Sequence, residues 1–158
     1  MATTAYSTLY DSSGNPIGGR PKSSNVGYND ETLVGLAFAT TALDLAADFT
    51  YAIPVRSGKV IEYIDLGEWT ELDTGGGNAL DMDIVLRTTS SAGTVTNTIL
   101  FNAGTFFTAA QTAGAILRVW CMAKVPDCAT SVGHIGFLVN TAASTANAGT
   151  GNIHAHIV

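Results

Sequence analysis

The segment "ALDMDIVLR" (residues 79–87) alternates between apolar and polar side chains. Its apolar residues recur at every second position, at Leu80, Met82, Ile84 and Leu86. Asp81, Asp83 and Arg87 stand between them, and Val85 is the apolar exception. Because successive side chains of a β-strand point to opposite faces of a sheet, a period of two indicates a strand with one buried and one wetted face. The segment therefore predicts an amphipathic strand.

Short β-branched, aromatic or alternating runs recur along the chain after residue 30. They predict further strands at residues 33–41, 49–55, 59–69, 94–102, 115–125, 134–140 and 151–158. The stretches between them, such as "TGGGN" and "SSAG", are rich in turn-forming residues. About eight short strands without long intervening helices indicate an all-β fold. We predict an antiparallel β-sandwich of the jelly-roll type.

The first 30 residues differ in composition from the rest. "DSSGNPIGGRPKSSN" (11–25) concentrates Gly, Pro, Ser and Asn, which interrupt regular structure. We therefore predict an extended N-terminal arm (1–30) before a β-sandwich domain (31–158), with a plain flexible tail as the alternative. Such an arm becomes ordered only against another surface. Its apolar and basic side chains are expected to contact a neighbouring protein, through Tyr6, Leu9, Tyr10, Ile17, Arg20 and Lys22.

Charge and hydropathy exclude several classes of partner. The net charge is −6, and the seven basic residues provide no basic stripe for phosphate groups. No apolar run reaches the roughly 18 residues of a membrane span. The N-terminus also lacks the basic start and apolar core of a signal peptide. We predict neither a nucleic acid nor a membrane partner, and synthesis in the cytoplasm.

Two long tracts, residues 88–117 and 128–158, contain no Asp, Glu, Lys or Arg. A free-standing soluble domain normally intersperses charges over its surface, so the outward faces of strands in these tracts are expected to be covered by protein. Other copies of the same chain are the commonest cover, which predicts a homodimer or homotrimer. The predicted oligomer face consists of Ile116, Trp120, His134, Leu138, His154, His156 and Val158.

Three histidines lie in the last two predicted strands. A hairpin that places His134 opposite His156 would set all three on one outward face, and three imidazoles can hold zinc. The pair His154 and His156 also invites comparison with cupins, whose His-x-His is followed by a glutamate ligand. Here no acidic residue follows Asp127. We therefore predict a polar strand face, with no metal and no cofactor.

No other motif predicts a catalytic residue. "DTG" (73–75) matches the aspartic protease triplet in a single copy, without the flanking apolar pattern. Cys121 and Cys128 lack the C-x-x-C spacing of zinc and redox sites. They are expected to be reduced, mostly buried thiols. The sequence therefore predicts a non-enzymatic protein.

Several segments together resemble the small jelly-roll decoration or cement proteins of tailed bacteriophage capsids. They are "YDSSGNPIGG", "LDLAADFTYAIPV", "KVIEYIDLG", "LDMDIVLRTT" followed by "AGTVTNTILFN", and "GTGNIHAHIV". The resemblance implies a virion structural protein on the outer surface of the capsid, assembled in the host cytoplasm. It also implies binding to the major capsid protein as a dimer or trimer that bridges capsomers, with the arm reaching over neighbouring subunits. It implies no catalytic residues.

Two other functions stay open at the level of sequence. A carbohydrate-binding sandwich, in an adhesin or a tail-fibre tip, would use exposed aromatic rings such as Trp69, Trp120 or Tyr63. A cupin-like enzyme would bind a metal through His154 and lose it on substitution to alanine. Binding of glycans would distinguish the first function from that of a capsid protein, and stoichiometric bound metal would distinguish the second.

Overall fold

The computed structural model describes residues 4–6, 30–129 and 132–158, with side chains for 36–129 and 132–158. The strands are β1 (Thr4–Tyr6), β2 (Asp30–Phe38), β3 (Phe49–Arg56), β4 (Val60–Gly67), β5 (Asp81–Thr89), β6 (Val95–Gly104), β7 (Ile116–Lys124), β8 (Val132–Thr141) and β9 (Gly149–Ile157). Two short 3-10 turns, η2 (Thr40–Ala42) and η3 (Phe106–Thr108), complete the regular structure of these ranges. Within the described residues, no helix is long and apolar enough to cross a bilayer.

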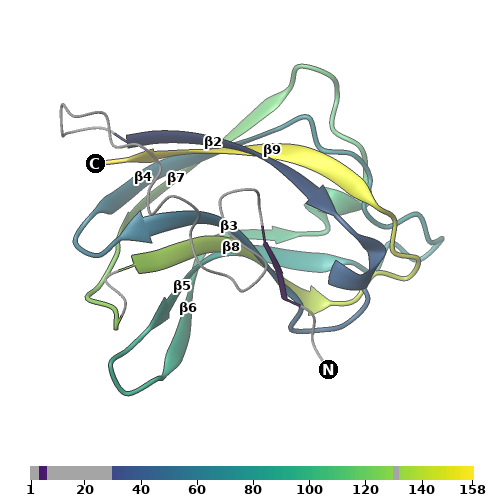
Figure 1. The fold of residues 1–158 in the computed structure, drawn as a ribbon. Coiled ribbons are helices and arrows are strands. Elements are labelled where there is room, and N and C mark those ends of the chain that lie inside the picture. The colour runs from purple at the N-terminus through teal and green to yellow at the C-terminus, as the bar shows by residue number, and fades with distance from the viewer. Residues whose placement is uncertain (1–3, 7–29, 130–131) are drawn as a thin grey trace.

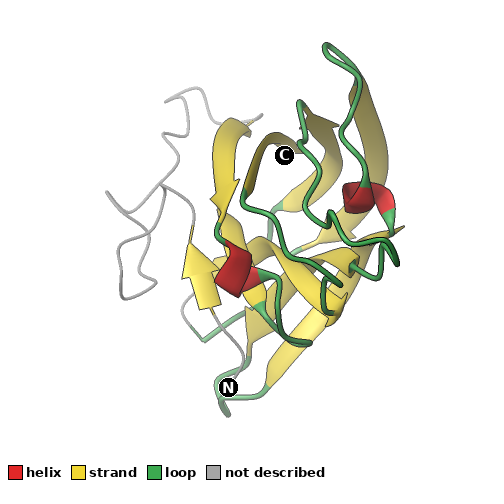
Figure 2. Ribbon diagram, turned by 90° about the vertical axis from the view of Figure 1, so that its right-hand side faces the viewer, coloured by secondary structure: helices red, strands yellow, loops and turns green. Residues whose placement is uncertain are grey.

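The strands form two sheets that pack face to face (Figures 1 and 2). A four-stranded sheet has the order β2-β9-β4-β7, and a five-stranded sheet has the order β1-β3-β8-β5-β6. From β2 onward, each strand crosses to the opposite sheet from its predecessor except at the β5–β6 hairpin. This is the order of an eight-stranded jelly roll, extended by β1, which pairs in parallel with β3. The predicted fold class is confirmed.

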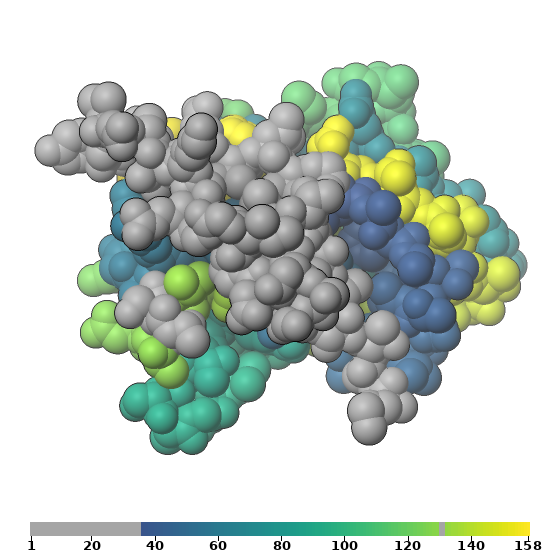
Figure 3. Space-filling view, in the orientation of Figure 1, coloured from purple at the N-terminus to yellow at the C-terminus, as the bar shows by residue number. Residues whose placement is uncertain are grey.

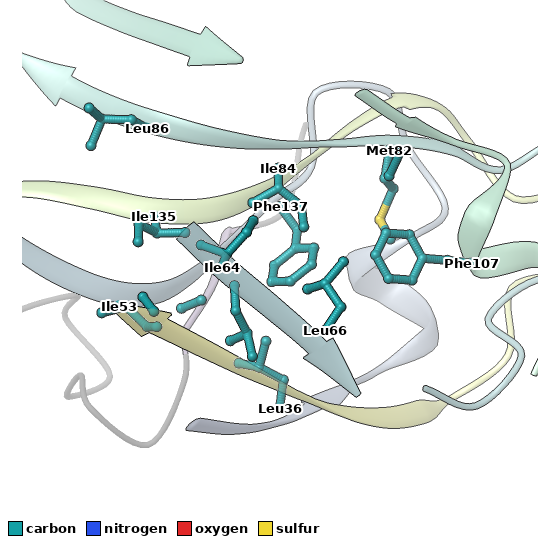
Figure 4. Close-up of a cluster of buried hydrophobic side chains, with 14 of the residues drawn as sticks. Leu36, Ile53, Ile64, Leu66, Met82, Ile84, Leu86, Phe107, Ile135 and Phe137 are labelled. Atoms are coloured by element: carbon teal, nitrogen blue, oxygen red, sulfur yellow. The ribbon is translucent and has the colours of Figure 1, made fainter. Parts of the chain in front are cut away.

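The hydrophobic core lies between the sheets, where alternate residues of facing strands meet (Figure 4). Met82, Ile84 and Leu86 are buried, as the alternation in residues 79–87 predicts. The predicted wetted face is wrong at Asp83 and Val85, which are only 5% and 0% exposed. Trp69 is only 2% exposed and contacts the rings of Phe38, Phe107 and Phe137. A Cβ atom at Gly151 would collide with the Trp69 ring, so a glycine makes room for it. Trp69 is a core residue and is not available to a sugar.

The predicted hairpin between the last two strands is wrong. β8 pairs with β3 and β5, whereas β9 pairs with β2 and β4 in the other sheet. His134 therefore lies opposite Pro54 and Arg87 and not opposite His156. The burial pattern within each strand is nevertheless as predicted, with Ile135 and the other core-facing residues buried. Alternation determines which side chains are buried, but it does not identify the neighbouring strand.

The connection between β8 and β9 crosses the sandwich because it is bound to the segment before β5. Asp73 forms a β-bridge with Ala146, and the Asn147 N–H donates to the carbonyl oxygen of Leu72 at 2.9 Å. The Asn147 side chain donates to the Glu71 carbonyl oxygen, also at 2.9 Å. These distant contacts replace the tight turn that a hairpin would need.

Asp73 is the centre of this attachment. Its buried carboxylate accepts backbone hydrogen bonds from Leu80, Ser144 and Thr145 at 2.9–3.0 Å. The Gly75 N–H and the Ser144 hydroxyl donate as well, at 3.1 and 2.8 Å. Burial alone would raise the pKa of Asp73, but the hydrogen bonds outweigh burial and hold the pKa well below its usual range. The aspartate of "DTG" is thus an ionised structural residue and not a protease catalyst.

Candidate protein-contact surface

The outward side of β7 exposes large apolar side chains. Along this strand Ile116, Trp120 and Met122 point away from the core and are 70%, 65% and 65% exposed. The alternate residues, among them Leu117 and Val119, pack against the core. We call the exposed set the apolar stripe (Ile116, Trp120 and Met122). Single exposed apolar residues are ordinary, but three on the same face of one strand, interrupted only by Arg118, are a feature typical of surfaces that contact other proteins.

A row of aromatic rings holds Trp120 in place across three strands. The Trp120 ring meets Tyr63 of β4 edge-on at 5.1 Å between centroids. Tyr63 in turn stacks on His156 of β9 at 5.0 Å with an interplanar angle of 6°. The guanidinium of Arg118 lies 4.0 Å from the Tyr63 ring centroid. Because neighbouring rings already order Trp120, this side chain loses little freedom when a partner covers it.

The charged groups beside the apolar stripe largely neutralise one another. Arg118 donates two hydrogen bonds to Asp65, at 2.7 and 2.8 Å. The hydrogen bond with Arg118 is the main cause that lowers the pKa of Asp65. His154 Nδ1 lies 3.4 Å from the same carboxylate, and His156 Nε2 lies 3.3 Å from Glu62. The surface therefore presents one ion pair, two imidazoles close to carboxylates, and apolar groups, which suits contact with protein.

A hollow of about 430 Å³ adjoins the apolar stripe on this sheet. Its floor includes Gly67, which has no side chain to fill the space between Ile116 of β7 and Asn152 of β9. The Asn152 side chain donates to Glu68 at 2.7 Å on the rim. The other lining residues are Asp65, Gly114, Ala115 and His154. The hollow is large enough for a side chain or a small ligand.

The residues predicted to form one oligomer face lie on two opposite faces of the sandwich. Ile116 and Trp120 share the four-stranded sheet with His154 and His156. Val158 continues that sheet, because it pairs with Val60 through backbone hydrogen bonds of 2.8 and 2.9 Å. The remaining two residues, His134 and Leu138, belong to β8 in the five-stranded sheet. The single face was wrong because it depended on the β8–β9 hairpin. Whether these residues contact other subunits stays a prediction.

The outward face of the five-stranded sheet is built differently. The His134 ring meets Tyr51 edge-on at 5.1 Å. Burial and nearby Arg87 lower the pKa of His134 to about 4. The Arg87 guanidinium lies 3.4 Å from the centroid of the Phe49 ring, which fills the space that Gly136 leaves open. Here the aromatic groups are covered, whereas on β7 they are exposed.

The three-histidine cluster considered from the sequence does not form, since His134 is in the other sheet. In the described ranges, no group of three or more His, Cys, Asp or Glu side chains is placed to hold a metal. His154 and His156 alternate with buried Ile153, Ala155 and Ile157, so they point outward and not into the sandwich as cupin ligands would.

The thiols show no activated cysteine. Cys121 and Cys128 are both free and half-buried. Burial raises the pKa of the Cys121 thiol to about 11, which keeps it protonated and unreactive at neutral pH. The Cys128 thiol donates to the carbonyl oxygen of Pro126 at 3.1 Å.

Most of the predicted arm contacts lie outside the described residues. Tyr6 ends β1, where its backbone is in register with Tyr51 of β3. The other five, Leu9, Tyr10, Ile17, Arg20 and Lys22, fall in the range that is not described. The arm and its contacts remain a prediction.

The predicted contact residues did not include Met122 or the ion pair of Arg118 with Asp65, and Tyr63 was considered only as a sugar-binding ring. Met122 follows Trp120 by two positions, so the alternation already placed it on the same face. The Arg118–Asp65 pair carried no such signal, because it depends on the register between β4 and β7. Val95 and Ile99 of β6 were also missed, and they are 54% and 57% exposed.

Two solved structures share this architecture. A chain in the capsid of Ralstonia phage GP4 superposes with a TM-score of 0.60 at 16% identity, covering 99% of this chain and 97% of that one. A chain in the capsid asymmetric unit of cyanophage Pam1 gives a TM-score of 0.58 at 14% identity, covering 82% and 83%. The fold is one that phage capsids use. No protein-family model and no curated protein sequence matches the chain.

Proposed function

We propose that this chain is a non-enzymatic virion structural protein of a tailed phage, a decoration or cement protein that binds the assembled capsid. The observation that carries the proposal is the apolar stripe, three large side chains at least 65% exposed on the outward face of one strand. The likeness of the fold to chains of two phage capsids supports it. The partners would be the major capsid protein and further copies of the chain, on the outer surface of the virion.

The size of the apolar stripe indicates how the protein would bind. Covering it would remove roughly 300 Å² of apolar surface, a gain of about 7 kcal/mol. Association itself costs about 4–15 kcal/mol, so one copy would bind weakly. An oligomer that engages several capsomers at once gains affinity through multivalency. The protein would then stabilise contacts between capsomers by bridging them.

Co-sedimentation tests this function. Purified protein is mixed with phage shells assembled without it, in near-physiological salt, and the pelleted fraction is measured. Wild-type protein should pellet with the shells and reach saturation, and Ile116→Asp should weaken binding by at least about 10-fold, because it places a charge in a desolvated contact.

Leu45→Asp is the matched control for this experiment. Leu45 is also an exposed apolar residue, 41% exposed, but it lies in the connection between η2 and β3. Its substitution should leave binding unchanged. Absence of binding by the wild type, or equal loss in the two variants, would contradict the proposed function.

A carbohydrate-binding module is the second candidate, favoured by one observation. Exposed Trp120 lies on the same sheet as the 430 Å³ hollow, whose rim carries polar groups of Asp65, Glu68 and Asn152. Aromatic faces beside polar groups are typical of ligand sites. Specific signals on a glycan array that disappear in Trp120→Ala would favour this function over capsid binding.

A further inference from the structure

β6 is an edge strand with little protection. Its first five residues, Val95 to Ile99, are all exposed, including the apolar side chains at both ends. The β5–β6 hairpin projects from the body of the sandwich (Figures 1 and 3). The hairpin closes at Gly93, whose φ of 80° suits glycine, with Ser90 and Thr94 joined by a 2.9 Å hydrogen bond. The projecting strand is therefore well formed and accessible along its open edge.

The long edge strands at the other positions carry the features that oppose strand addition. β7 contains Arg118 and Lys124, and at Met122, with φ of 48°, the ladder to β4 is irregular. β2 begins with Asp30 and Glu31. Charged side chains and irregular backbone protect edges from pairing. β6 contains no charged residue and no proline. Its ladder to β5 is irregular beyond Ile99 but regular from Val95 to Ile99, so this first part of its edge is suited to pairing with another strand.

The sequence of this edge is self-complementary. Residues 95–99 read "VTNTI", which is symmetric in side-chain type about Asn97. Antiparallel pairing of two copies about Asn97 sets Val95 opposite Ile99 of the second copy and Thr96 opposite Thr98. Apolar pairs and threonine pairs are both favourable across antiparallel strands. A two-fold axis at Asn97 would therefore match every side chain of the segment with a compatible one.

The backbone supports the same register. Ser90 and Thr94 form a hydrogen-bonded pair, and such pairs alternate along an antiparallel ladder. The backbone groups of Val95, Asn97 and Ile99, which are opposite Thr89, Arg87 and Val85, therefore point away from β5. These are the residues whose donors and acceptors a second strand would take up in a pairing centred on Asn97.

No like charges would meet across the axis. Within the β5–β6 hairpin, the charged residue opposite Asn97 is Arg87, which donates to Asn97 Oδ1 at 2.9 Å and lies over the Phe49 ring. Two copies of Arg87 would be three strand spacings apart, about 14 Å. That distance exceeds the Debye length of about 8 Å in physiological salt, so their repulsion is largely screened.

We propose that two copies of this chain dimerise by antiparallel pairing of β6 with β6, centred on Asn97. The five-stranded sheets then join into one continuous sheet across the dimer. The inference deepens the proposed function, on which its biological role rests, because it names the contact through which the decoration protein self-associates. It leaves the apolar stripe, on the opposite sheet, free for the capsid shell.

Sedimentation equilibrium of the full chain tests the pairing, from about 10 μM to 1 mM, a range that detects micromolar to submillimolar dissociation constants. Wild-type protein should show a monomer–dimer equilibrium. Val95→Lys/Ile99→Lys sets like charges opposite each other at both ends of the pairing. Val95→Lys/Ile99→Glu removes the same apolar groups but sets opposite charges there. The first variant should weaken dimerisation by at least about 30-fold, and the second should stay within about 5-fold of wild type.

The outcomes separate this inference from the proposed function. A wild-type monomer at every concentration, an undisturbed dimer in the two-lysine variant, or equal loss in both variants would overturn the pairing. Circular dichroism should show the same folded spectrum for both. Ile116→Asp should retain the dimer while losing shell binding. A wild-type protein that dimerises but does not bind shells counts against capsid binding alone, whereas a wild-type monomer that binds shells counts against the β6 pairing alone.

Discussion

The two edge strands β6 and β7 both expose large apolar side chains, yet they differ in how they can bind protein. β7 alternates its apolar residues with Arg118 and Lys124 and contains the left-handed residue Met122. β6 has no charge and keeps a regular open edge between Val95 and Ile99. A protected edge can still use its outward side chains, whereas an unprotected edge can also offer its backbone. The comparison assigns a different contact to each side of one sandwich.

The largest expected effect concerns Asp73, which stabilises the sandwich that carries both edge strands. Asp73→Asn should lower the free energy of unfolding by about 3 kcal/mol, because its amide would face N–H donors that now bond to a carboxylate. The pKa of Asp73 is lowered in the folded state. The ionised carboxylate therefore contributes its full stabilisation of the fold above the unfolded pKa of about 3.9, and this contribution is lost as pH falls below that value. Urea unfolding of wild-type and variant protein at pH 7 and pH 3 measures the effect of the substitution and its dependence on pH.

Asp81→Asn is the control for this prediction. Asp81 is a half-buried carboxylate nearby, and the Asn140 side chain donates to it at 3.4 Å. Its substitution should cost less than about 1 kcal/mol. Equal urea midpoints for the two variants would show that Asp73 does not hold the connection before β9 to the start of β5.

Reciprocal truncations compare the two edges directly. Trp120→Ala should weaken shell binding by about 30-fold, because large aromatic side chains dominate protein contacts, and should leave the dimer unchanged. Ile99→Ala should weaken the dimer and leave the affinity of each subunit for the shell unchanged. Titration of shells and sedimentation equilibrium give the two constants. If both variants affected both constants equally, the separation of roles between β7 and β6 would be wrong.

The sheet that carries β6 should respond to mild acid through His134. Because the pKa of His134 is about 4 in the folded protein and about 6.5 when unfolded, the unfolded state binds more protons between these values. Stability should therefore fall by about 1–2 kcal/mol from pH 7 to pH 5. His134→Gln should remove that slope in urea unfolding. An unchanged slope would assign it to another group.

The smallest expected effect concerns the ion pair on the β7 side. Arg118→Lys keeps the charge but loses the paired hydrogen bonds to Asp65. Shell affinity should fall by about 3-fold, and the urea midpoint should stay close to that of the wild type, since exposed ion pairs contribute little to stability. A loss as large as that of Trp120→Ala would mean that charge, and not the apolar stripe, dominates binding.

The strands and their buried faces could be predicted from the sequence because alternation is a local property. Residues 79–87 and 134–140 send the expected side chains into the core. The neighbours of each strand could not be predicted in this way. His134 was paired with His156 on a plausible register, but the connection after β8 binds Asp73, more than 70 residues earlier. Such long-range contacts leave no periodic trace in the sequence.

The candidate surface was predictable in part for the same reason. The outward position of Ile116 and Trp120 follows from the alternation along β7, and it was predicted. The exposure of Val95 and Ile99 was not predicted, because this projecting part of β6 has no buried face to produce a pattern. The symmetric segment "VTNTI" becomes informative only once β6 is known to be an open edge.

Hydroxyl-radical footprinting with mass spectrometry tests most directly whether the β7 surface is covered on a capsid. In the free protein, Trp120 and Met122 should be oxidised readily, since both are 65% exposed, while Trp69, at 2%, serves as the buried reference. On shells, oxidation of Trp120 and Met122 should fall toward the level of Trp69. Equal oxidation of these two residues in the free and shell-bound protein would contradict the account.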